Sequence, residues 1–197
     1  MSKKKRKPRR KKPKYVPPLS LAARASGFVV HANRKDSLAR VMDEAIYAWF
    51  FEFDPFAIHL LVCPCYFVLC DLGKNNGKGP RFEQTFGRFD MTAAYDFLRH
   101  AEADVLNDSV DLPHVLNQSM LFDAINSFSK LFGTRTIYMR AFAAYFALHP
   151  RHASATLSKH GAEFLPKGIS VEEASKLGRI AAFQKFTEMF ATQEGID

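Results

Sequence analysis

Apolar residues recur through most of this 197-residue chain with the 3.6-residue period of an α-helix, and the strict alternation of a half-exposed β-strand is nearly absent. The clearest stripe lies between Pro113, which can open a helix, and Gly133, which can end one. Its members are Leu116, Met120, Leu121, Ala124, Ile125, Phe128, Leu131 and Phe132. A helix with one apolar face must bury it against another element, so the pattern predicts helices packed on helices.

Comparable patterns predict further helices at residues 36–49, 56–72, 91–107, 136–148 and 170–190. Asp36 is expected to be the N-cap of the first, and Ser170 opens the last with a capping box that contains Glu173. We therefore expect an all-α fold, a compact bundle of six or seven helices. Its expected organisation is a disordered arm (1–14), an extended Pro-containing linker with a short helix (15–35), a single helical domain (36–192) and a frayed C-terminus (193–197).

Positive charge is concentrated at the start of the chain. The formal charge is +8, yet ten of the 28 Lys and Arg residues fall within the first 14 positions, so residues 15–197 carry −2. Residues 2–14 contain no apolar side chain that could offset the loss of chain entropy on folding, so the arm is expected to be disordered when free. Its cations are Lys3, Lys4, Lys5, Arg6, Lys7, Arg9, Arg10, Lys11, Lys12 and Lys14.

A cationic arm of this kind is typical of a segment that binds a polyanion. Contacts with phosphates release counterions, so we expect binding to the DNA or RNA backbone that weakens steeply with salt and hardly depends on base sequence. A nuclear-import signal and a surface for anionic lipid or an acidic protein are alternative interpretations. The sequence does not distinguish DNA from RNA.

The body of the chain is itself divided in charge. Residues 36–126 carry −8 and residues 127–185 carry +6. Within the basic half, Arg140, Arg151, His152 and Lys159 are the candidate phosphate contacts, although solvated helix faces would show the same composition. The basic half contains Lys130, Arg135, Arg140, Arg151, His152, Lys159, His160, Lys167, Lys176, Arg179 and Lys185.

No motif in the sequence indicates an enzyme. The glycines of residues 73–79 are not followed by the Lys-Ser/Thr of a P-loop, and the nucleophile-elbow and zinc-protease motifs are absent. Asp96 and His100 lie four residues apart, a spacing that any amphipathic helix offers by chance. We expect no catalytic residues and no cofactor.

A cluster of potential metal ligands contains His59, Cys63, Cys65 and Cys70. Three thiolates and an imidazole could hold zinc, but the usual spacing is missing, so small buried thiols are the preferred interpretation and no metal site is predicted. Whether these four residues bind a metal stays open at this point.

The apolar run at residues 55–72 is shorter than the roughly 20 residues that span a bilayer and contains His59 and Pro64. We expect a buried core helix and no membrane span. The stretch after the arm is interrupted by Pro17, Pro18 and Arg24, so it does not match an export signal. A cytoplasmic location is expected, or a nuclear one if the source is eukaryotic.

The basic, proline-containing start (7–19), the Leu21-Ala22-Ala23 segment and the segments 98–101 and 121–125 resemble small bacteriophage proteins of uncharacterised function. The resemblance implies a bacterial cytoplasm and no particular activity. We therefore expect a non-enzymatic protein associated with nucleic acid, an accessory or inhibitor of host nucleic-acid machinery, with a protein partner on the helical body. The alternatives are a structural or packaging protein of a particle and a small helical enzyme acting on phosphate-bearing substrates.

Overall fold

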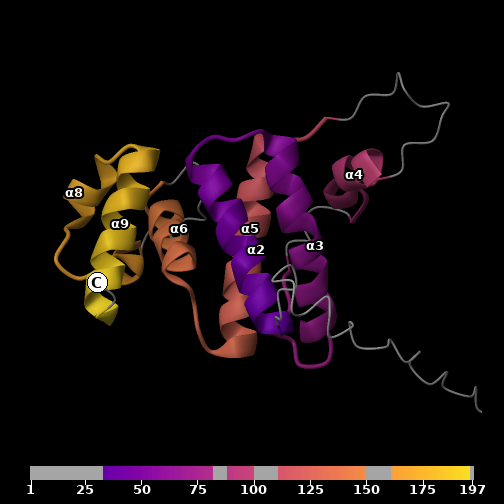
Figure 1. Cartoon of the computed structure of the whole chain (residues 1–197), viewed down its shortest axis with the longest axis horizontal. Helices are drawn as coiled ribbons and strands as arrows, with labels where there is room; N and C mark the ends of the chain where they lie inside the picture. The colour runs from indigo at the N-terminus through magenta and orange to yellow at the C-terminus, as the bar shows by residue number, and fades with distance from the viewer. Residues whose placement is uncertain (1–32, 82–87, 100–110, 150–160, 196–197) are drawn as a thin grey trace, which may run out of the picture. The chain divides into compact units, whose positions relative to one another are not determined.

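The computed structural model describes residues 33–81, 88–99, 111–149 and 161–195, and these residues form an all-α fold (Figure 1). Their elements are α2 (Arg34–Phe50), α3 (Pro55–Gly73), α4 (Arg88–Arg99), α5 (His114–Phe132), α6 (Ile137–Leu148), the 3-10 helix η2 (Gly161–Phe164), α8 (Val171–Ser175) and α9 (Arg179–Glu194). The predicted fold class is confirmed. The chain divides into two units, Met1–Asn33 and Arg34–Asp197, and all of these helices lie in the second.

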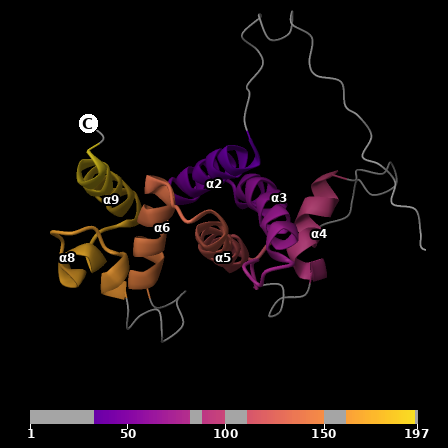
Figure 2. The same ribbon diagram turned by 90° about the horizontal axis from the view of Figure 1, so that it is seen from below.

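Two groups of helices meet at α6. In the first group α3 packs against both α2 and α5, and α4 covers another side of α3 (Figure 2). In the second group α9, η2 and α8 pack against α6. Because α6 also contacts α2 and α5, it lies in the middle of the packed core. Its side chains are apolar on nearly every side, as a central helix requires.

Aromatic rings fill the contact between α2, α6 and α9. The ring of Trp49 meets that of Phe142 edge to face at 4.9 Å, and Phe50 lies 4.8 Å from Phe183. Phe142 and Phe50 are fully buried. Large buried rings in edge-to-face pairs contribute both burial energy and a preferred geometry, so they fix how these three helices meet.

Several predicted helix ends are confirmed. The α5 stripe lies in the core, and Gly133 ends the helix with φ 70°, the left-handed conformation that glycine adopts without strain. Ser170 caps α8 by accepting a hydrogen bond from Glu173 N at 3.1 Å. Asp54, which the sequence analysis did not single out, caps α3 through Phe56 N and Ala57 N.

Other predicted boundaries are wrong. Helix α2 begins at Arg34, so Asp36 lies inside its first turn and is not the N-cap. The predicted helix 170–190 is two helices, because the chain leaves α8 at Lys176 and Gly178 takes an extended conformation (ψ 164°) before α9. Helix α9 continues to Glu194, two residues into the end that was expected to fray.

One helix among the described residues, α3, is long and apolar enough to cross a membrane by length and composition, which is weak evidence on its own. In this fold its residues Ile58, Val62, Tyr66 and Leu69 are buried in the core. These are the contacts that a buried core helix makes.

Candidate functional site

Most of the candidate phosphate contacts fall outside the residues that the structure describes. These are the ten cations of the arm together with Arg151, His152 and Lys159. Arg140 is described, and it lies on α6 with its guanidinium 4.0 Å from the centre of the Phe190 ring and in an ion pair with Glu194. Arg140 is therefore the one predicted phosphate contact among the described residues, and it lines a pocket between α6, η2 and α9.

The candidate metal ligands do not converge among the described residues, where no group of three His, Cys, Asp or Glu side chains could hold a metal ion. His59 Nδ1 lies 2.7 Å from Asn117 Oδ1 and Nε2 lies 2.9 Å from Met91 O. Burial lowers the pKa of His59 more than these hydrogen bonds raise it. The imidazole thus links α3 to α4 and α5 within the core.

The three cysteines have the burial expected of small core thiols. Cys63 and Cys65 are buried, Cys70 is partly buried, and none of the three forms a disulfide in the described part of the chain. Burial raises the pKa of the Cys65 thiol to about 11, so this thiol stays protonated and unreactive at neutral pH.

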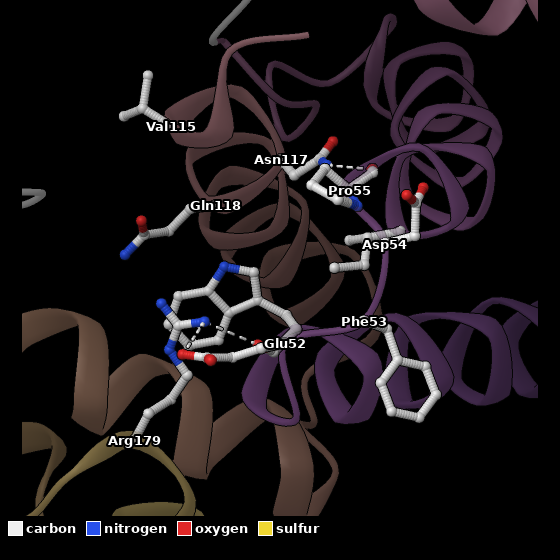
Figure 3. Close-up of a pocket in the computed structure, with 10 residues that line it drawn as sticks. Glu52, Phe53, Asp54, Pro55, Val115, Asn117, Gln118 and Arg179 are labelled. Atoms are coloured by element: carbon white, nitrogen blue, oxygen red, sulfur yellow. Dashed lines mark hydrogen bonds and ion pairs between the residues drawn. The ribbon is translucent and has the colours of Figure 1, made fainter.

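A pocket of about 440 Å³, here called the Trp49 pocket, opens where α2 turns into α3 (Figure 3). Helix α2 ends in a Schellman turn, in which Phe53 N donates to Ala48 O and Glu52 N to Trp49 O. Glu52 occupies the left-handed position of that turn with φ 57°, a conformation that strains a residue with a side chain. The turn brings Glu52, Phe53 and Asp54 to one edge of the pocket.

Residues of α5 and α9 complete the lining of the Trp49 pocket. Arg179 lies over the Trp49 ring at 4.3 Å, donates to Trp49 O at 3.2 Å and pairs with Glu52 at 3.4 Å (Figure 3). Gln118 on α5 is buried, and its Nε2 has no hydrogen-bond acceptor in the described structure. A buried donor without an acceptor is destabilising, so this part of the lining can offer a hydrogen bond to a bound group.

A second pocket of about 250 Å³, here called the two-arginine pocket, lies between α6, η2 and α9. Arg135 and Arg140 both line it, together with Glu163, Phe164, Leu165 and Phe190. Burial lowers the pKa of Arg135, and the charge of Arg140 lowers it further. Both guanidinium-bearing side chains therefore line one pocket, and their like charges repel each other.

The half-buried carboxyl of Asp43 connects α2 to the start of α6. Thr136 Oγ1 donates to Asp43 Oδ1 at 2.5 Å and accepts from Met139 N at 3.1 Å. Burial raises the pKa of Asp43 from 3.8 to about 6, against the opposing effect of the Thr136 hydrogen bond. The carboxyl is therefore charged at neutral pH at some cost to the folded state.

Comparison of the chain with models of protein families finds no match, and the searches of curated proteins and of solved structures find none either. The resemblance to bacteriophage proteins stays a prediction.

Proposed function

We propose that this protein is a non-enzymatic, nucleic-acid-associated protein whose basic arm contacts the phosphates of DNA or RNA. The observation that carries the proposal is the placement of ten cations and no anion within the first 14 residues, on a body of net charge −2. Such an arm adds affinity for a polyanion without an ordered binding surface. A phage or mobile-element accessory or inhibitor fits this description.

The helical body then serves to bind a partner protein, and the Trp49 pocket supports this part of the proposal. Its lining includes Phe53, a residue that is 53% exposed, and Gln118, whose amide nitrogen has no acceptor among the described residues. An exposed aromatic ring and an unused hydrogen-bond donor lining one pocket are features that partner proteins commonly cover.

The arm is tested by measuring the affinity of the full chain for a DNA duplex and an RNA duplex over a series of salt concentrations. If ten arm cations each neutralise one phosphate, the slope of log K against log salt reaches about −9 for duplex DNA. Replacing the ten Lys and Arg residues by Gln is expected to abolish most of the affinity and flatten the slope.

A chain with the arm residues in scrambled order is the matched control, because it keeps the composition and length. It is expected to bind as the natural chain does, since phosphate contacts do not depend on the order of the cations. Unchanged affinity and slope in the Gln-substituted chain would show that the arm is not the nucleic-acid contact.

A further inference from the structure

The two-arginine pocket contains a hydrogen-bond donor that the fold does not satisfy. Arg135 Nη2 donates to Asn126 Oδ1 at 3.1 Å, but its Nε is buried and has no acceptor among the described residues. No carboxylate of the described chain forms an ion pair with Arg135. A half-buried guanidinium without an anionic partner is costly, because burial removes water and the single hydrogen bond to Asn126 replaces only part of that hydration.

The second guanidinium adds to this cost. Arg140 lies over Phe190 and Arg135 lies 5.9 Å from the Phe164 ring centre. The rings support the two guanidinium groups on their faces but carry no negative charge that would neutralise them. Among the described residues, the two guanidinium groups of this pocket form one ion pair, between Arg140 and Glu194.

The carboxylate of that ion pair is poorly placed in its own helix. Glu194 is the last residue of α9, which ends at Gly195 in a left-handed cap. The free carbonyl groups at a helix C-terminus make a negative charge there unfavourable. The Glu194 side chain is also 39% exposed, so it can leave Arg140 and enter water without unfolding the helix.

We propose that the two-arginine pocket binds one phosphate group, which accepts hydrogen bonds from Arg135 and Arg140 and displaces Glu194 from Arg140. A phosphate offers more acceptor oxygens than a carboxylate and matches the planar fork of guanidinium donors, and the pocket volume of about 250 Å³ admits it. Glu163 also lines the pocket, and its carboxylate repels a bound anion, so we expect the two guanidinium groups to hold a single phosphate. This inference rests on the proposed function, since the phosphate would belong to a nucleic-acid backbone.

The test follows the Nε–H signal of Arg135 by NMR in the full chain while inorganic phosphate replaces chloride at constant ionic strength. A saturable shift of this signal is expected. In Arg135→Lys, which keeps the charge but removes the planar fork of donors, the signals of neighbouring residues are followed instead and are expected to show no saturable shift with phosphate. A short single-stranded DNA is expected to produce the same shift, whereas an uncharged methylphosphonate analogue is not.

Two variants of α9 provide a matched pair that does not disturb the core. Glu194→Gln removes the competing carboxylate and is expected to tighten phosphate binding by about two- to fivefold, the range of a partly exposed ion pair. Glu188→Gln makes the same change of charge at an exposed position of the same helix and is expected to change the affinity much less.

The proposal is overturned if phosphate causes no saturable shift at Arg135, if the two glutamate variants bind alike, or if inorganic phosphate shifts the signal and DNA does not. The proposed function fails separately. If phosphate and DNA shift the Arg135 signal as expected but neutralising the arm leaves the affinity for nucleic acid unchanged, the phosphate site is supported and the proposed role of the arm is refuted.

Discussion

The raised pKa of the Asp43 carboxyl predicts how the free energy of unfolding depends on pH. Asp43→Asn is expected to stabilise the protein at pH 7.5 and to have little effect near pH 3.5. The reason is that the folded state raises the pKa of this carboxyl from 3.8 to about 6, mainly by burial. An amide at this position keeps an oxygen for the Thr136 hydroxyl and carries no charge that burial would penalise.

The sign follows from proton binding. Between pH 3.8 and about 6 the folded state holds a proton on Asp43 that the unfolded state has released, so the free energy of unfolding falls as the pH rises through this window. At about 1.4 kcal/mol per pKa unit, the rise in the pKa of Asp43 would lower the free energy of unfolding by about 3 kcal/mol at pH values above both pKa values. Because solvent reaches part of the carboxyl and screens it, we expect a gain of about 1–2 kcal/mol in the variant.

The measurement is urea denaturation of the full chain and of Asp43→Asn at several pH values between 3.5 and 7.5. Glu188→Gln, on an exposed face of α9, is the control and is expected to show no comparable pH-dependent gain. A variant that is no more stable than the natural chain at pH 7.5, or a gain that persists unchanged at pH 3.5, would refute the reasoning.

Two further substitutions test the helix ends by chemical denaturation. Gly133→Ala is expected to lower the free energy of unfolding by about 1–2 kcal/mol, because a side chain is strained at φ 70° although space surrounds it. Gly178→Ser, at a negative φ and a capping position, is its control and should cost nothing. Asp54→Ala should lower the free energy of unfolding by about 1 kcal/mol, because it removes the cap of α3. Asp54→Asn should retain most of the stabilisation by the cap, and equal losses in the two variants would contradict a capping role.

The sequence predicted the helices whose signals are local. The α5 stripe and its stop at Gly133, the central helix up to Leu148 and the Ser170 cap all depend on residues within a few positions of one another. The break between α8 and α9 was missed because the apolar spacing continues across it. Gly178 was the available signal, since glycine is accepted at an N-cap and weakens a helix interior.

The pockets could not be predicted from the sequence, because each joins segments far apart in the chain. Arg135 and Arg140 were both recognised as members of the basic half, but Phe164 and Glu194 reach them only through the packing of η2 and α9 on α6. The same applies to Gln118 and Arg179 in the Trp49 pocket. Charge counted along a sequence indicates a class of ligand, whereas the position of a binding site depends on tertiary contacts.

The position of Trp49 has a practical consequence, since it is the single tryptophan of the chain. Its indole contacts Phe142 of α6 and the guanidinium of Arg179 at the start of α9, and it forms part of a pocket wall. Intrinsic fluorescence excited at the indole band therefore reports on one defined junction of three helices. A ligand that moved Arg179 off the ring would change this emission without any added label.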